Sequence, residues 1–332
     1  MKERKMPIYI RQLEALLRRL PVHHPKRNLI GENLAKHMAG YKGEQSIDYP
    51  LSFISEKEYS ILHDIRLSNY DKYFQIDTII LSTKFLLFLE IKNIAGTLIF
   101  DTKFNQLIRI TEGNSEGFPD PVLQIKRQEI QIKRWLSLHG FSSSLPIESL
   151  VVISSPRTII KSSDDNLLHT IIHSANLPHK IKWFESKYKR KVIDNVDRLI
   201  HRIITEHSPL QQNILEQYKI EKGELLKGVQ CEKCLVIPMV KVKKGWCCTS
   251  CKDFSKVAHE DTIRDYALLI STTYTNGNLK EFLHVSSGMV VNRILHTLNL
   301  PYTGNNKGRI YDLTSFQSYF CYNKYVRIRR GV

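Results

Sequence analysis

The alternation of hydrophobic and polar positions predicts a mixed α/β domain in the first half of the chain. The expected elements are a helix over 42–54, strands over 59–67, 74–81, 85–92, 96–100 and 105–110, a helix over 122–138 and a strand over 150–154. The two central runs are hydrophobic at nearly every position, which is typical of strands that are buried on both faces. The order helix, three strands, helix, strand therefore predicts a domain built round a central sheet.

The segments on either side of this domain are more basic and more helical. Residues 1–41 predict one or two basic helices interrupted by Pro21 and Pro25, and residues 154–180 a polar loop. A short strand over 181–184 and a basic helix over 187–206 are expected next. We expect five parts: a basic helical extension (1–41), the α/β domain (42–160), a connecting segment (161–228), a cysteine-rich module (229–255) and a helical module (256–332).

Three charged residues interrupt the central hydrophobic runs. Asp77 lies near the start of one run, and Glu90 and Lys92 end the next. Alternate residues of a strand share a face, so a hairpin would bring Asp77, Glu90 and Lys92 to one sheet edge. Two carboxylates bind a hard cation such as Mg²⁺, and a neighbouring lysine positions water, as phosphodiester cleavage requires. A solvated strand edge is the alternative, and the hydrophobic surroundings weigh against it.

The net charge of the chain narrows the class of binding partner that we expect. The 332 residues carry a net charge of +16, with 49 lysines and arginines against 33 acidic residues. Such an excess favours a polyanion, with DNA first and RNA second because no RNA-stacking aromatic motif is recognisable. No stretch approaches the roughly 20 apolar residues of a spanning helix, and no signal peptide begins the chain, so we expect no membrane partner.

The cysteines are concentrated in one segment. Two Cys-x-x-Cys pairs, Cys231 with Cys234 and Cys248 with Cys251, are separated by thirteen residues. Four thiolates suit a closed tetrahedral Zn²⁺ site of structural type, here a zinc ribbon, with Cys247 as an alternative ligand to Cys248. A redox Cys-x-x-Cys is less probable because there are two pairs. Clustered cysteines favour a reducing, cytoplasmic location over a disulfide framework.

The last eighty residues predict a second nucleic-acid module. Helices are expected over 262–271, 279–284 and 289–298, the last two resembling a helix-turn-helix, and residues 302–311 a basic turn or wing. A plain packing hairpin is equally compatible with this pattern. If the module binds DNA, Gly304 permits close backbone approach to phosphate, and the expected basic contacts are Lys307, Arg309, Arg327 and Arg329.

The first half of the chain resembles the NERD family, the nuclease-related domain found mainly in bacteria. The resemblance covers about residues 40–160 and rests on Gly43-Glu44, Gln75-Ile76-Asp77, 89–93 (Leu-Glu-Ile-Lys-Asn) followed by Gly96, and Asp120-Pro121 leading to Gln124. It implies the PD-(D/E)xK nuclease superfamily, with a restriction-endonuclease-like αβββαβ core and a central mixed sheet. Family members similar over the full length carry a C-terminal zinc ribbon.

The resemblance also implies roles for individual residues. Asp77 and Glu90 would bind Mg²⁺ or Mn²⁺ together with the backbone carbonyl of Ile91. Lys92 would orient the attacking water, and Glu44 and Gln124 would reach the same site. The family usually has Asn-Pro where this chain has Asp120-Pro121. The expected activity is that of a metal-dependent DNA endonuclease, and the alternative is an inactive nucleic-acid-binding adaptor with a nuclease-like fold.

Overall fold

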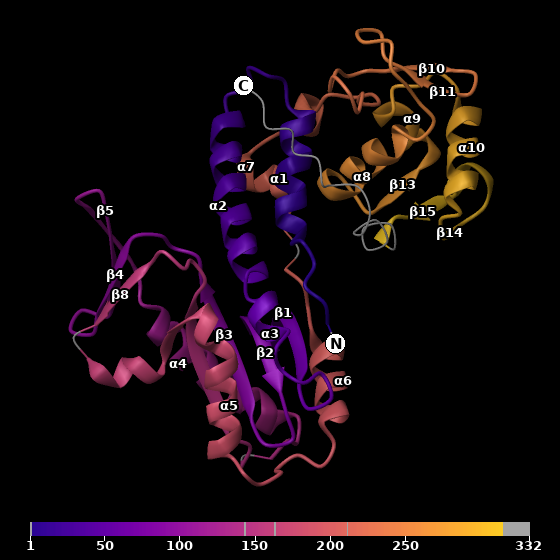
Figure 1. The fold of residues 1–332 in the computed structure, drawn as a ribbon. Coiled ribbons are helices and arrows are strands. Elements are labelled where there is room, and N and C mark those ends of the chain that lie inside the picture. Colours follow the sequence, from indigo (N-terminus) through magenta and orange to yellow (C-terminus); the bar gives the residue numbers. More distant parts are fainter. Residues whose placement is uncertain (1, 143, 163, 211, 315–332) are drawn as a thin grey trace. The chain divides into compact units, whose positions relative to one another are not determined.

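Two compact units divide the chain in the computed structural model, which describes residues 2–142, 144–162, 164–210 and 212–314 (Figure 1). The first unit comprises Met1–Arg4 and Met38–Gln211, and the second comprises Lys5–His37 and Gln212–Val332. Helix α2 (Arg27–Gln45) contributes its last turns to the first unit.

A mixed five-stranded sheet forms the centre of the first unit, as the sequence predicts. Its strand order is β1-β2-β3-β7-β9, with antiparallel pairing from β1 to β3 and parallel pairing from β3 to β9. The strands are β1 (Ser60–Asn69), β2 (Lys72–Leu81), β3 (Leu86–Lys92), β7 (Ile147–Ile153) and β9 (Ile171–His173). Helix α4 (Pro121–Leu138) connects β3 with its parallel neighbour β7, by way of strands β4 to β6.

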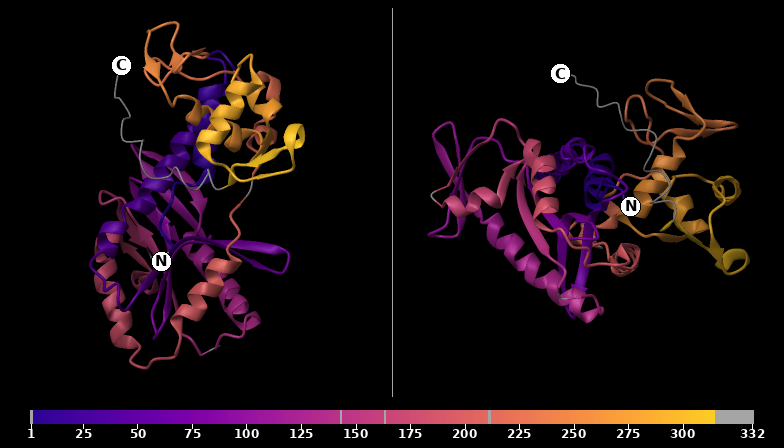
Figure 2. Two further views of the ribbon diagram at one scale, coloured as in Figure 1. Left: turned by 90° about the vertical axis from the view of Figure 1, so that its right-hand side faces the viewer. Right: turned by 60° about the horizontal axis from the view of Figure 1, so that its bottom comes forward.

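Both faces of this sheet are buried, which explains the unbroken hydrophobic runs of the central strands. The even-numbered residues Leu86 and Phe88 of β3 pack in one core. Ile125 and Ile132 of α4 belong to the same core. The odd-numbered residues of β3 pack in another with Ile181 of helix α5 (Leu177–Lys187). Figure 2 shows the strands between the magenta helix α4 and the pink helix α5. The residue parity along β3 therefore decides which helix covers each side chain.

A second sheet has the strand order β6-β5-β4-β8. Its strands are β4 (Thr97–Asp101), β5 (Gln106–Thr111), β6 (Asn114–Pro119) and β8 (Ile159–Ser162). The pairing of β4 with β5 follows the sequence prediction, whereas β8 and β9 lie in the segment 154–180 that we predicted as a polar loop, and β6 lies where we predicted no element. These strands are so short that periodicity gives no signal for them. Two 3₁₀ turns, Asp165–His169 and Ser174–Asn176, complete this region.

Three predicted elements of the first unit are wrong in type or extent. The strand expected over 181–184 is part of helix α5, in which Leu177, Ile181 and Phe184 recur at helical spacing. The helix expected over 187–206 is α6 (Val196–Glu206), which begins only where the side chain of Asn195 accepts a hydrogen bond from the backbone N–H of Arg198. The helix expected over 42–54 is the end of α2, followed by the separate short helix α3 (Asp48–Leu51).

The second unit begins with helix α1 (Ile8–Arg19), which ends before Pro21 as predicted. Its hydrophobic side is buried against α7 (Ile214–Tyr218), followed by the 3₁₀ turn Lys222–Glu224. The cysteine-rich segment forms a small sheet of β10 (Val240–Val242), β11 (Gly245–Cys247) and β12 (Phe254–Ser255). The described residues contain no helix that is long and apolar enough to cross a membrane.

Three helices lie close to the predicted ranges 262–271, 279–284 and 289–298 at the end of the described chain, and a small sheet accompanies them. The order is α8 (His259–Leu269), β13 (Thr273–Thr275), α9 (Asn276–Phe282), α10 (Gly288–Leu298), β14 (Tyr302–Thr303), the 3₁₀ turn Asn306–Gly308 and β15 (Ile310–Asp312). Strand β15 pairs with both β13 and β14, so the loop between β14 and β15 forms a wing beside α10.

Candidate active site

The hairpin of β2 and β3 brings Asp77 and Glu90 to neighbouring positions. Thr78 pairs with Leu89, and the same register places Asp77 opposite Glu90. The backbone N–H of Ile91 donates to Asp77 Oδ2 over 2.9 Å, so the carboxylate of Asp77 lies against the end of β3. The side chain of Glu90 is buried, with 4% exposed, whereas a quarter of the Lys92 side chain reaches solvent.

Helix α4 covers this face of the sheet and contributes two glutamines. Lys92 Nζ donates to Glu90 Oε1 over 2.6 Å and to Gln124 Oε1 over 3.2 Å. Gln128 Nε2 donates to Glu90 Oε2 over 3.1 Å and to the carbonyl of Gln75 over 2.9 Å. Both oxygens of Glu90 therefore accept hydrogen bonds from the protein, which fixes the orientation of this carboxylate.

Sequence reasoning missed Gln128. Its amide is buried, and its Oε1 atom has no hydrogen-bond partner among the described residues. A signal was available: Gln128 follows Gln124 by four residues, and such positions share one face of a helix.

Burial and neighbouring carboxylates together disfavour the ionised form of Asp77. Burial, the Glu90 carboxylate and the Glu44 carboxylate raise the pKa of Asp77 well above its ordinary value, against the opposing effects of the Ile91 N–H and Lys92. The site thus carries more negative charge than the protein's own cations balance. A divalent cation would relieve this repulsion, because it favours the ionised form of each carboxyl group.

Helix α2 reaches this region because of a glycine. A Cβ atom at Gly43 would lie 2.3 Å from the Cβ atom of Asn93, so only glycine allows the helix so close to the end of β3. The side-chain amide of Asn93 donates to the carbonyl of Ala39 over 2.8 Å and joins the two elements. The next residue, Glu44, is thereby held near the strand ends.

Glu44 forms an ion pair that the sequence did not predict. Arg4 Nη1 lies 2.9 Å from Glu44 Oε2, and only 4% of the Arg4 side chain is exposed. Burial raises the pKa of Glu44 to about 7, although the Arg4 charge acts in the opposite direction. Forty residues separate the two partners in the chain, and no local pattern signals such a pair.

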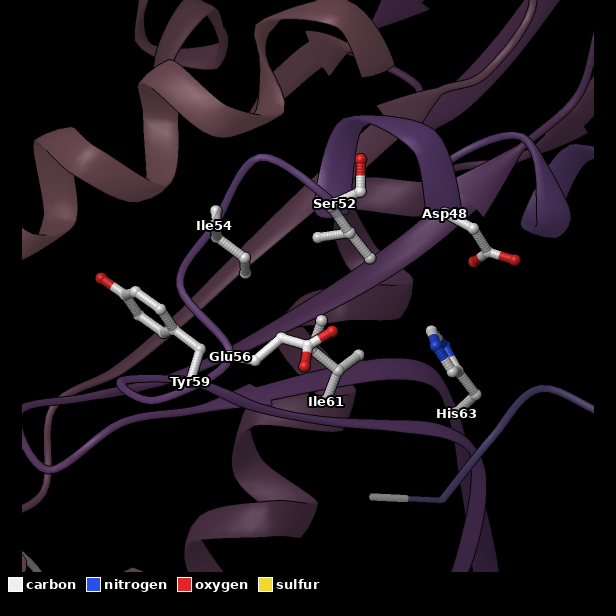
Figure 3. A pocket seen from close by; sticks show the side chains of 8 residues that line it. Asp48, Ser52, Ile54, Glu56, Tyr59, Ile61 and His63 are labelled. Carbon is white, nitrogen blue, oxygen red and sulfur yellow. The ribbon is translucent and has the colours of Figure 1, made fainter.

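Arg4 is also the centre of a wider polar cluster. Its guanidinium contacts Asp48 Oδ1 at 3.2 Å and His63 Nδ1 at 2.9 Å. Burial and the neighbouring Arg4 and Lys2 charges lower the pKa of His63 to about 3, so its imidazole is neutral at physiological pH. A hollow of about 180 Å³ adjoins Asp48 and His63, and both polar residues such as Glu56 and hydrophobic residues such as Ile61 line it (Figure 3).

Asp120 begins helix α4. Its Oδ1 atom accepts a hydrogen bond from the backbone N–H of Val122 over 2.8 Å, and Pro121 occupies the first helical position. Asparagine caps a helix as well as aspartate does. The departure from the Asn-Pro pattern therefore leaves the helix start intact.

The structure brings the predicted site residues together in part. Glu90, Lys92 and Gln124 are joined by hydrogen bonds, and Asp77 and Glu44 are close enough to these groups to influence one another's charge. The acidic residues do not, however, form a group of three ligands. Within the described residues, only four cysteines bring at least three His, Cys, Asp or Glu ligand atoms within 4.8 Å of one another.

That group is Cys231, Cys234, Cys248 and Cys251, as the sequence spacing predicts. Cys234 Sγ lies 3.4 Å from Cys248 Sγ, and Cys231 Sγ lies 3.6 Å from Cys251 Sγ. Cys247 is not a member; its thiol points to the carbonyl of Cys248 at 3.9 Å. Four converging thiols of this kind are compatible with a structural metal such as zinc.

The predicted DNA contacts are only partly described by the structure. Arg309 precedes β15, and its guanidinium lies 4.1 Å from the centre of the Tyr302 ring. Gly304 has a φ of +76°, and a Cβ atom there would lie 2.7 Å from the carbonyl oxygen of Gly308, so the wing requires glycine. Lys307 lies in the turn Asn306–Gly308, but its side chain is outside the described part, as are Arg327 and Arg329.

Comparison with known proteins supports the resemblance in the first unit. Residues 39–154 match the family model of the nuclease-related domain, NERD. The matched segment contains Gly43, Glu44, Asp77, Glu90, Lys92 and Gln124. No curated protein and no solved structure matches the chain. The family match therefore indicates a nuclease-related function for the first unit, and the four cysteines indicate a metal site in the second.

Proposed function

We propose that the protein is a Mg²⁺- or Mn²⁺-dependent endonuclease that hydrolyses phosphodiester bonds in DNA. The observation that carries this proposal is the hydrogen-bonded set Glu90, Lys92 and Gln124 with Asp77 on the neighbouring strand. The order α2, β1, β2, β3, α4, β7 supports a PD-(D/E)xK nuclease core of restriction-endonuclease-like type.

The donor set fits a divalent cation. The pKa of Asp77 is raised by burial and by the Glu90 and Glu44 carboxylates, and acidic groups gathered in this way are typical of a cation site. Asp77, Glu90 and the carbonyl of Ile91 would hold the ion. When bound, such an ion offsets charge on the scissile phosphate and lowers the pKa of a coordinated water.

The protein's own groups would position the reactants. Lys92 carries a positive charge at the end of β3 and would orient the attacking water and stabilise the negative charge that develops on the phosphate. Gln124 holds the Lys92 ammonium from the side of α4. Glu44, with its pKa of about 7, could accept or donate a proton near neutral pH.

The second unit would bind the substrate. We infer Zn²⁺ as a structural ion at Cys231, Cys234, Cys248 and Cys251, and phosphate contacts at Lys307, Arg309, Arg327 and Arg329. A net charge of +16 supplies affinity for DNA that does not depend on sequence. Five free cysteines among the described residues favour a reducing compartment, and we infer a cytoplasmic location.

One observation favours a second function, that of an inactive nucleic-acid-binding adaptor. Lys92 pairs with Glu90, and Arg4 pairs with Glu44, so protein cations already hold two of the acidic groups. A divalent cation would then compete with Lys92 and Arg4 for carboxylates whose negative charge is already partly neutralised.

Cleavage assays separate the two functions. The purified protein is incubated with supercoiled plasmid and with linear duplex DNA in Mg²⁺ or Mn²⁺, beside the variants Asp77→Ala, Glu90→Ala and Lys92→Ala. Asp194→Ala, which removes an exposed carboxylate elsewhere in the first unit, is the matched control. We expect cleavage by the wild type and the control only. Equal cleavage by Asp77→Ala and Glu90→Ala would refute the proposed site, and salt-sensitive binding without cleavage by any form would favour the adaptor.

A further inference from the structure

Helix α10 presents an exposed polar face. Val291, Ile294 and Leu295 are buried in the core of the second unit. The opposite face is exposed and carries Met289, of which 75% is accessible, together with Asn292, Arg293 and His296. In a helix-turn-helix, the second helix is the one that lies in the major groove of DNA.

Two segments of the second unit are positively charged. They are the hairpin of β10 and β11 and the stretch from α10 through the wing. Residues 240–247 and 288–311 contain six lysines and arginines and no aspartate or glutamate: Lys241, Lys243, Lys244, Arg293, Lys307 and Arg309. Lys243, Lys244 and Arg293 are exposed, and none of them forms an ion pair within the described residues. By contrast, Lys227 of the same unit pairs with Glu281 at 2.6 Å. These two segments thus carry exposed cations and no acidic residue of their own to offset them.

The hairpin lies close to α10. Met239 and Trp246 from the hairpin region pack in the same core as Val291 of α10. The charge of Arg293 is near enough to contribute, after burial, to lowering the pKa of Lys241. Trp246 also donates to His259 Nδ1 of α8 over 3.1 Å, which fixes the hairpin to the helical module.

On its wing side, α10 borders a polar hollow of about 560 Å³. Asn292, His296 and Arg309 line this hollow, and no acidic residue of the described chain lines it. The Nε atom of Arg309 is buried without a hydrogen-bond partner in the described part of the chain. The exposed face of α10 therefore has a basic hairpin near Arg293 and a polar, basic hollow near His296.

We propose that α10 and the β10–β11 hairpin form one composite surface for duplex DNA, with α10 in the major groove and the hairpin turn against the adjoining phosphates. The choice of DNA as partner rests on the proposed function; the surface itself rests on exposure and charge. Arg293 and His296 contact base edges, while Lys243, Lys244 and Arg309 contact phosphate oxygens. Because the four-cysteine cluster holds the hairpin, metal loss weakens DNA binding even though no cysteine touches the DNA.

The test measures binding without cleavage. The full chain with Asp77→Ala, zinc-loaded and without added Mg²⁺, is used to select duplexes from a random pool, and affinities for the selected and a scrambled 30-base-pair duplex are measured by fluorescence anisotropy across salt concentrations. We expect Arg293→Ala to lower affinity for the selected duplex by about 5- to 150-fold, equivalent to about 1–3 kcal/mol for a bidentate base contact, and to affect the scrambled duplex less.

Loss of phosphate contacts gives a different signature. The double variant Lys243→Ala/Lys244→Ala should weaken binding to both duplexes equally and reduce the slope of log affinity against log salt by about 2. Lys222→Ala/Lys256→Ala removes two exposed lysines outside the hairpin and α10 and serves as the matched control, which should change neither quantity specifically. Thermal melting of each variant verifies the fold.

Two results would overturn the inference. One is unchanged affinity and salt slope when Arg293, Lys243 and Lys244 are all replaced by alanine. The other is equal binding of duplex RNA, whose deep and narrow major groove does not admit a helix. Either result leaves the cleavage assay untouched, so a failure of the composite surface is distinguishable from a failure of the nuclease.

Discussion

The two candidate metal sites of the chain are built in opposite ways. The four cysteines lie within 21 residues of sequence, and their sulfur atoms lie within 4.8 Å of one another. The acidic site draws on α2, β2, β3 and α4, and its carboxylates accept hydrogen bonds or ion pairs from Arg4, Lys92 and Gln128. One site offers four thiols that a metal could join, whereas the carboxylates of the other are already held by protein side chains.

The two sites should therefore respond differently to the loss of a bound ion. A cluster of thiols without internal cations gains most of its stability from the metal. A carboxylate site that is fixed by its own hydrogen bonds keeps its geometry when the ion leaves, which suits an ion that must be exchanged or shared with substrate.

Loss of the four-cysteine site should have the largest effect. Cys234→Ser/Cys248→Ser should prevent metal binding and unfold the small sheet, because a structural zinc supplies about 10–16 kcal/mol of folding free energy in such modules. The measurements are metal content and the emission maximum of Trp246, which is buried in the folded unit. Cys247→Ser is the matched control and should retain the metal. Full metal content in the double variant would contradict the assignment.

Removal of Lys92 should affect chemistry without affecting the fold. Lys92→Met should lower the cleavage rate by about 10²–10³, as expected for one charged group that stabilises a transition state. Mg²⁺ binding, measured by calorimetry, should persist in this variant because Asp77 and Glu90 remain. Loss of Mg²⁺ binding together with activity would show that Lys92 acts through the metal site.

The two sites also differ in how much of them the sequence predicts. The cysteine spacing alone identifies all four members of the cluster, because both pairs lie in short knuckles joined by one hairpin. For the acidic site, parity along β3 predicts that Glu90 and Lys92 share a face, and the β2–β3 turn predicts the position of Asp77. Arg4 and its pairing with Glu44 depend on tertiary packing between distant segments, which no periodicity encodes.

The sequence predicts an element of the fold only where burial imposes a strict residue pattern on it. The long hydrophobic strands and α4 are clear because their burial requires a strict residue pattern. The segment 181–184 is too short to distinguish period 2 from period 3.6, and it is helical only in the context of Leu177 and Lys187. Short polar strands such as β6 are stabilised by pairing with β5, which a single segment does not reveal.

Gln128 should support the acidic site indirectly, because it holds the carboxylate of Glu90 in place. Gln128→Leu keeps the side-chain size but removes the donor to Glu90, so Glu90 is freed to rotate. We expect a 10- to 100-fold loss in cleavage rate or in affinity for Mg²⁺, similar to other substitutions behind a metal ligand. Gln128→Glu should be worse than Gln128→Leu, because it adds a fourth carboxylate. Wild-type activity in both variants would show that Glu90 is positioned by Lys92 alone.

Asp77 should destabilise the metal-free fold. Its raised pKa means that the folded state resists its ionisation, so Asp77→Asn should increase the free energy of unfolding at pH 8 by on the order of 1 kcal/mol. The same substitution should abolish the stabilisation of the wild type by Mg²⁺. Chemical denaturation with and without Mg²⁺ measures both effects. A less stable metal-free Asp77→Asn protein would indicate that the hydrogen bond from Ile91 outweighs the repulsion.

The smallest expected effect concerns the pH dependence that Glu44 adds to the first unit. Its pKa is raised from about 4.5 in the unfolded chain to about 7, so the folded state binds the proton more tightly between these values. The stabilisation that protonated Glu44 contributes to the folded state is therefore fully present below about pH 4.5. It is lost as the pH rises to about 7. About a quarter of the Glu44 side chain is exposed, so the loss should be on the order of 1 kcal/mol.

Glu44→Gln should remove this part of the pH dependence. Denaturation at pH 5 and at pH 7.5, without metal, should show a smaller difference in unfolding free energy for Glu44→Gln than for the wild type. Arg4→Ala should act in the opposite direction, because it removes the cation that lowers the pKa of Glu44 and so extends the loss of stability above pH 7. Identical pH profiles for the three proteins would mean that Glu44 titrates as it does in the unfolded chain. In that case, the acidic site would be no more constrained by the protein than a solvated strand edge.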